Sequence, residues 1–70
     1  MTQPETLADA LPKEMARVRE VLGHYKELGP VGAIGALLIE ADLRRADQAS
    51  ASGDVVKMLA AMTVLRSIKD

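Results

Sequence analysis

Cysteine, tryptophan and phenylalanine are absent from the 70-residue chain, which has one tyrosine, Tyr25, and one histidine, His24. The absence of cysteine excludes a disulfide, and a lone histidine with no carboxylates at ligand-like spacing predicts no metal site and no cofactor. A domain of this size buries only about 60% of the surface that its unfolded chain exposes, so it needs further support. Because disulfides and metals are missing, we expect that support to be oligomerisation.

A strong charge imbalance is absent as well. The chain has 9 basic and 10 acidic residues, a net charge of −1 and a pI near 5.7. This balance predicts no global attraction to nucleic acid or to an anionic membrane. The first thirty residues carry charges throughout and contain no apolar run of signal-peptide length. We therefore expect a cytoplasmic protein with no membrane segment.

One stretch lacks charged and polar side chains altogether, residues 30–39, Pro-Val-Gly-Ala-Ile-Gly-Ala-Leu-Leu-Ile. It is about half as long as a membrane-spanning helix, which needs about 20 apolar residues. Its apolar surface must therefore be covered by protein. Gly32 and Gly35 would let a neighbouring backbone approach closely, since glycine has no Cβ. Alternatively they form a swivel or a partly unwound entry to the second helix, because each glycine costs about 1 kcal/mol relative to alanine in a helix. They do not form a phosphate-binding loop, because no strand precedes them and no Lys-Ser/Thr pair follows.

Apolar residues recur at helical spacing in three segments, which predicts an all-α chain with helices near residues 10–28, 30–51 and 54–68. In the first segment the seam consists of Leu11, Met15, Val18, Leu22 and Tyr25. Asp9 is the expected N-cap of that helix, and Pro12 is expected in its first turn. We accordingly expect residues 1–9 to be a flexible N-terminus and residues 10–70 to form a single helical domain.

Glycines mark the two breaks between these helices. Gly29 followed by Pro30 predicts a very short connection, with the glycine ending one helix and the proline starting the next. Gly53 followed by Asp54 predicts a second C-terminal glycine and an N-cap, although Ser52 could also serve as the cap. Helix three is apolar over a wide arc. Three helices of this length have too little mutual surface to cover all their apolar faces, which favours a homodimer, intertwined or side by side.

No group of residues predicts catalysis. His24 lies one turn after Glu20, but no serine, threonine or cysteine has a spacing that implies a nucleophile beside it. In the second helix, Asp42 and Arg45 share one face and Glu40, Arg44 and Asp47 share another. We interpret both faces as solvated, or as a polar rim around a protein interface. We therefore expect a protein that is not an enzyme.

Three blocks carry a resemblance: Leu11-Pro12-Lys13-Glu14-Met15-Ala16-Arg17-Val18-Arg19, Gly29-Pro30-Val31-Gly32-Ala33-Ile34-Gly35-Ala36 and Ser52-Gly53-Asp54-Val55-Val56-Lys57-Met58-Leu59. In these blocks the chain resembles small, uncharacterised helical accessory proteins from the early regions of transposable bacteriophages and prophages. The resemblance implies a protein of the bacterial host cytoplasm that binds and modulates or inhibits a host protein. Host proteins of this kind include quorum-sensing regulators, pilus motors and defence complexes.

These observations predict a non-enzymatic protein–protein interaction module whose partners are a second copy of the chain and an unidentified host protein. The expected interface residues are Val31, Ile34, Gly35, Leu38, Met58, Met62 and Leu65, with Arg44 and Arg45 as a polar rim. The alternative is a small nucleic-acid-binding regulator. It is disfavoured because the basic residues are interleaved with acids and no aromatic stacking platform accompanies them.

Overall fold

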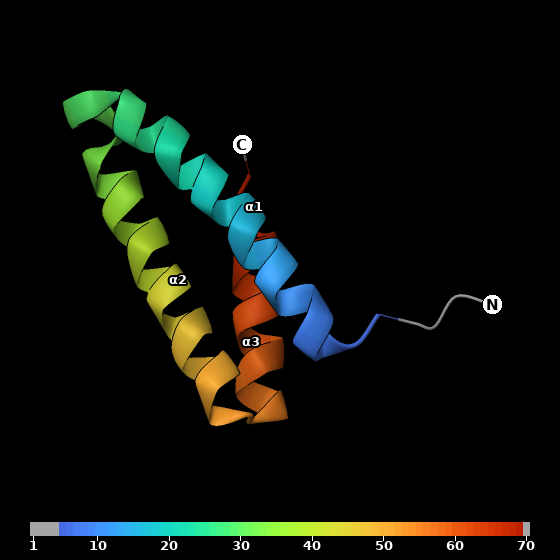
Figure 1. Cartoon of the computed structure of the whole chain (residues 1–70). Helices are drawn as coiled ribbons and strands as arrows, with labels where there is room; N and C mark the ends of the chain where they lie inside the picture. Colours follow the sequence, from blue (N-terminus) through green and yellow to red (C-terminus); the bar gives the residue numbers. More distant parts are fainter. Residues whose placement is uncertain (1–4, 70) are drawn as a thin grey trace.

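A computed structural model describes residues 5–69 of the chain. Its elements are α1 (Leu7–Glu27), the short 3₁₀ helix η1 (Gly29–Gly32), α2 (Ala33–Ser52) and α3 (Val55–Arg66). The three α-helices pack pairwise against one another, and within the described residues there is no strand (Figure 1). The prediction of an all-α fold with three helices is confirmed.

Each helix contributes one apolar face to a shared core. The largest fully buried side chains of this core are Leu11, Val18, Val21 and Leu65. Around them lie Met15 from α1, Ile39, Leu43, Ala46 and Ala49 from α2, and Met58 and Met62 from α3. Burial of each large side chain is worth about 1.5–3 kcal/mol relative to exposure. Leu22 and Tyr25, the last two residues of the predicted seam in the first helix, are only partly buried.

The first helix begins earlier than the sequence analysis expected. Thr6, not Asp9, is the N-cap: its Oγ1 accepts a hydrogen bond from the Asp9 amide at 3.2 Å and donates one to the Asp9 carboxylate at 2.8 Å. The spacing Thr-x-x-Asp resembles a capping box, a signal that the expected start at residue 10 overlooked. Leu7 and Ala10 pack against the core, which stabilises this extra turn. Residues 1–4 of the expected flexible segment lie outside the described residues.

Pro12 therefore lies inside α1, not in its first turn. It cannot donate to the carbonyl of Ala8, so one helical hydrogen bond is missing. Both residues are exposed, and water can satisfy that carbonyl.

The connection between the first two helices is a 3₁₀ turn, so α2 begins at Ala33 and not at Pro30 as expected. Gly29 has φ 65°, a left-handed conformation that ends α1, and Pro30 follows at the start of η1. Gly32 is buried against the end of α1, and a Cβ on it would lie 2.1 Å from the Tyr25 carbonyl oxygen. This close approach folds α2 back along α1.

The second connection agrees with its prediction. Gly53, with φ 68°, ends α2, and Asp54 caps α3 by accepting hydrogen bonds from the Val56 and Lys57 amides at 2.9 and 3.1 Å. The third helix ends at Arg66, two residues before the expected boundary at residue 68. Ends of helices commonly differ by this amount.

The third helix is much shorter than the other two, with 12 residues against 21 in α1 and 20 in α2. It ends beside the middle of α1, where Arg17 donates hydrogen bonds to the carbonyls of Leu65 and Ile68. Beyond that point the hairpin of α1 and α2 continues as a pair of helices (Figure 1). The far end of this hairpin is the region that the charge-free stretch occupies.

Candidate protein-binding surface

Five large apolar side chains are exposed at the far end of the α1–α2 hairpin. Val31 is 88% exposed and Ile34 is 75% exposed, and their neighbours in the chain also retain more than half of their surface. We call this set the tip surface; it consists of Leu28, Val31, Ile34, Leu37 and Leu38. Scattered apolar residues are normal on a protein surface, but a cluster this dense is typical of an interaction site.

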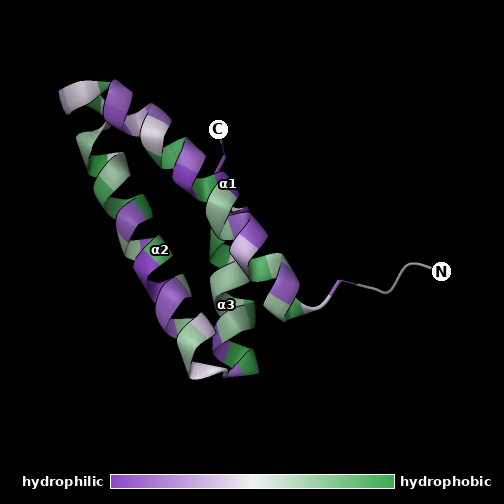
Figure 2. Ribbon diagram, viewed as in Figure 1, coloured by the Kyte–Doolittle hydropathy of each residue, from purple (hydrophilic) through white to green (hydrophobic). Residues whose placement is uncertain are grey.

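The tip surface is exposed because of the helical phase of α2 and the length of α3. Ala36 and Ile39 turn toward α1 and are buried, which leaves Ile34, Leu37 and Leu38 on the remaining sides of the helix. Apolar residues dominate this part of α2, whereas its second half is mostly polar on the outside (Figure 2). Because α3 stops beside the middle of α1, it does not extend to this end of the hairpin.

The predicted interface residues divide into two groups. Val31, Ile34 and Leu38 lie on the tip surface. The predicted residues of the third helix do not: Met58, Met62 and Leu65 are buried in the core of their own chain, with Leu65 fully enclosed. These three residues were expected at an interface because α3 is apolar on most sides, so its sequence does not distinguish an inner face from an outer face. The large apolar side chains that α3 exposes are Val55, Val56, Leu59 and Val64.

Gly35, the other predicted contact residue, serves a contact within the chain. A Cβ on Gly35 would lie 2.5 Å from Cε2 and 2.6 Å from Cδ2 of Tyr25. The ring of Tyr25 therefore packs directly on the backbone of α2 at this glycine. The close approach that the sequence predicted is thus made by α1, both at Gly32 and at Gly35.

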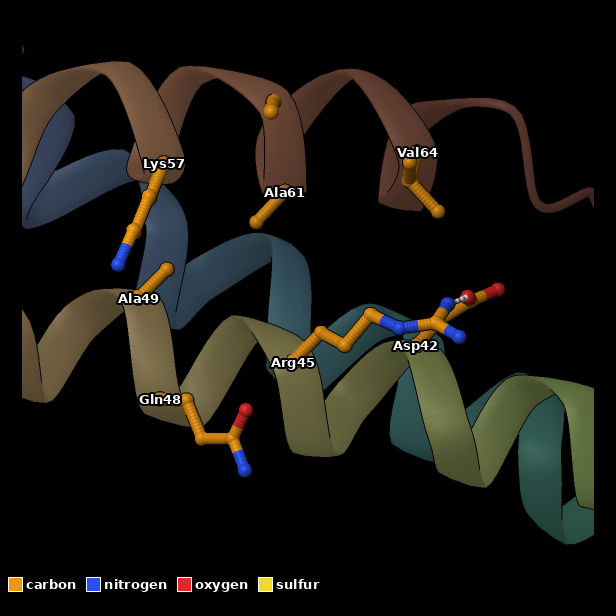
Figure 3. Close-up of a pocket in the computed structure, with 8 residues that line it drawn as sticks. Asp42, Arg45, Gln48, Ala49, Lys57, Ala61 and Val64 are labelled. Carbon is orange, nitrogen blue, oxygen red and sulfur yellow. Dashed lines mark hydrogen bonds and ion pairs between the residues drawn. The ribbon is translucent and has the colours of Figure 1, made fainter.

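A groove of about 350 Å³ runs between α2 and α3. We call it the α2–α3 groove, and all its lining residues come from these two helices (Figure 3). Small apolar side chains form one part of the lining: Ala49, Ala60, Ala61 and Val64. The polar part consists of Asp42, Arg45, Gln48 and Lys57. Apart from Arg45, none of these residues was among the predicted site residues, because the groove depends on how two helices pack.

The two predicted rim arginines lie in different places. Arg45 lines the α2–α3 groove and pairs with Asp42 at 3.1 Å, as the shared helix face predicted. Arg44, one residue earlier, is exposed outside the groove lining. Glu40 pairs across the hairpin with Lys26 at 3.5 Å. Lys57, on the α3 wall of the groove, has no ion pair with any residue that the structure describes.

His24 is exposed near the end of α1. Among residues 5–69, no three histidine or acidic side chains are grouped closely enough to hold a metal ion.

Near the start of α1, a hydrogen bond from Lys13 to the Glu5 carboxylate, together with the negative charge of that group, raises the pKa of Lys13. In the part of the chain that the structure describes, no helix is long and apolar enough to cross a membrane.

Comparison of the chain with protein-family models, with curated proteins and with solved structures gives no match.

Proposed function

We propose that this chain is a non-enzymatic protein–protein interaction module that uses the tip surface to contact a second copy of itself. The observation that carries the proposal is the exposure of five large apolar side chains in a segment without charge. Transfer of such side chains from water into an interface is favourable by about 25 cal/mol for each Å² of apolar surface. A two-fold axis would bring two identical tip surfaces together without opposing any like charges.

The module would also bind a second kind of protein. From the resemblance to small phage proteins, we propose that this partner is a host protein and that the module modulates or inhibits it. The mixed charge of the surface favours this reading over binding to nucleic acid, because five basic side chains are paired with acids: Lys13, Arg17, Arg19, Lys26 and Arg45.

Solution mass tests the proposal through two closely matched variants. Ile34 and Val56 are each 75% exposed, and each is the second residue of its helix, so a glutamate at either position meets a similar environment. By light scattering, we expect the wild-type chain at high concentration to have twice its 7.5 kDa mass. Ile34→Glu is expected to give a folded monomer, and Val56→Glu a dimer. A monomeric wild-type chain, or equal masses for the two variants, would contradict the proposal.

A further inference from the structure

We propose that the α2–α3 groove binds an amphipathic helix of another protein, with the apolar face of that helix on the groove floor and acidic residues along its flanks. This inference rests on the proposed function, since it names the protein segment that the module recognises. None of the residues that line the groove belongs to the tip surface, so separate variants can test the two sites; only Leu38, one turn before Asp42, adjoins both.

The shape of the groove suits a helix. Ala49 on α2 and Ala60 and Ala61 on α3 have small side chains, which let another helix approach close to the usual spacing of about 8–10 Å between axes. The first helix packs behind the pair formed by α2 and α3, which leaves the groove open on the outside (Figure 3). A bound helix would complete a four-helix bundle.

The apolar surface continues beyond one end of the groove. Leu38 precedes Asp42 by one helical turn, so it lies on the same side of α2 as the groove lining. Across from Asp42, Val64 lies near the end of α3 and is 42% exposed (Figure 3). Together these two side chains offer large apolar contacts where the alanine floor ends. A partner helix would place its bulkiest apolar residue at this end.

The charges around the groove select the chemistry of the partner. Arg45 stands on the α2 wall and Lys57 on the α3 wall, while Asp42 is the single acidic residue of the lining. The carboxylate of Asp42 already accepts a hydrogen bond from Arg45. The lining has two cations and one anion, a net charge of +1, and Lys57 is its cation outside an ion pair with the described residues, so the lining favours a helix with acidic flanks over one with basic flanks. Two cations are too few to hold the phosphates of a nucleic acid firmly.

The length of the groove sets the length of the partner segment. The lining residues on the third helix run from Lys57 to Val64, or about 11 Å at 1.5 Å per residue, within a helix of 12 residues. A partner helix of about four turns would cover it. Isolated helices of that length are marginally stable in water, so binding would be coupled to folding of the segment and would be weak for a short peptide.

The test uses two synthetic peptides of about 16 residues with the same leucine stripe at helical spacing, one flanked by glutamate and the other by lysine. Fluorescence anisotropy at low ionic strength measures their binding to the full chain. We expect the glutamate peptide to bind at least about tenfold more tightly than the lysine peptide. Equal affinities, or binding of neither peptide, would overturn the proposal.

Two charge-reversed variants make the comparison specific to the groove. In R45E/K57E both groove cations are reversed, and we expect the preference to switch to the lysine peptide. R44E/R66E makes the same change in net charge at exposed positions on the same two helices outside the groove lining, and is expected to keep the wild-type preference. An equal response of the two variants would mean that only the overall charge matters, and this would overturn the proposal.

A change to the floor distinguishes a partner helix from a second copy of the chain. Ala60 is exposed, so Ala60→Gln narrows the groove without disturbing the core, and glutamine is a good helix former. We expect weaker binding of the glutamate peptide and an unchanged light-scattering mass. If Ala60→Gln instead converts a dimer to a monomer, the groove is filled by a second copy, and the proposal is wrong while self-association stands.

Discussion

The guanidinium of Arg17, in the middle of α1, donates a hydrogen bond from Nη2 to the carbonyl oxygen of Leu65 at the end of α3, at 2.9 Å. The same Nη2 atom reaches the carbonyl of Ile68, also at 2.9 Å. Leu65 lies in the last turn of α3 and Ile68 just beyond its end, where the helix can no longer supply amide donors four residues ahead and the dipole favours a cation. Arg17 thus attaches the short third helix to the hairpin, at the point beyond which the hairpin continues without it.

Replacing Arg17 with methionine keeps an apolar stem but removes the two hydrogen bonds to the end of α3 together with the ion pair with Glu14. We expect Arg17→Met to lower the free energy of unfolding by about 1–2 kcal/mol, measured by urea denaturation. Arg19→Met is the control, because Arg19 is more exposed and lies 4.0 Å from its partner Asp47, a pair worth at most about 1 kcal/mol. If Arg19→Met lowers the free energy of unfolding as much as Arg17→Met does, the hydrogen bonds from Arg17 to α3 do not stabilise the fold beyond the effect of losing a surface arginine.

Gly32 and Gly23 should respond in opposite ways to alanine. A Cβ on Gly32 would meet the Tyr25 carbonyl oxygen at 2.1 Å, whereas nothing lies within 4 Å of a Cβ on Gly23 in the interior of α1. Gly23→Ala is therefore expected to raise the free energy of unfolding by up to about 1 kcal/mol, and Gly32→Ala to lower it by about 1–3 kcal/mol. Thermal denaturation of both variants measures the difference. Stabilisation by Gly32→Ala would mean that the ends of α1 and α2 are not in close contact.

Gly35 and Tyr25 should be energetically coupled. In the wild-type background a Cβ at position 35 would overlap the Tyr25 ring, so Gly35→Ala is expected to destabilise the fold. In a Tyr25→Ala background the ring is gone, and Gly35→Ala is expected to be neutral or stabilising because alanine favours helix. A double-mutant cycle should give a coupling energy of about 1 kcal/mol or more. Additive effects would contradict the packing of the ring on this glycine.

Asp54 should be worth more to stability than another exposed aspartate of the chain. Its carboxylate accepts hydrogen bonds from two amides at the start of α3, and Asp54→Ala is expected to cost about 1 kcal/mol in the free energy of unfolding. Asp47→Ala, which removes only the long contact with Arg19, is expected to cost less than half as much. Urea denaturation compares them, and equal costs would rule out the cap as a significant contribution.

Local signals in the sequence predicted the helices and their breaks. Gly53 and Asp54 serve as expected, because capping depends on residues close together in the chain. The pattern of Thr6 with Asp9 is also local, and it indicates the N-cap of α1 at Thr6, three residues before the expected cap at Asp9. The 3₁₀ turn at Gly29–Gly32 corresponds to the partly unwound entry that was one of two uses expected for the glycines, and the other use, close packing, is found at Gly32 beside the Tyr25 carbonyl.

The division of apolar residues between core and surface was predicted less well. In α1 the polar residues between Leu11, Met15 and Val18 marked the inner face correctly. In α3 the sequence offered no such contrast, so Met58 and Met62 were expected at an interface although they are buried in the core. The α2–α3 groove was missed because its alanines become a floor only when two helices are packed.

Cross-linking of single-cysteine variants is the most direct test of the proposed contact between the tip surfaces of two copies of the chain. The chain has no cysteine, so Val31→Cys introduces a unique thiol on the tip surface, and Ala51→Cys introduces one at the opposite end of α2. When each variant is treated with a short bis-maleimide reagent, we expect a covalent dimer as the main product of Val31→Cys and mostly monomer for Ala51→Cys. A monomeric product from Val31→Cys, or the same yield of dimer from both variants, would contradict the proposed contact.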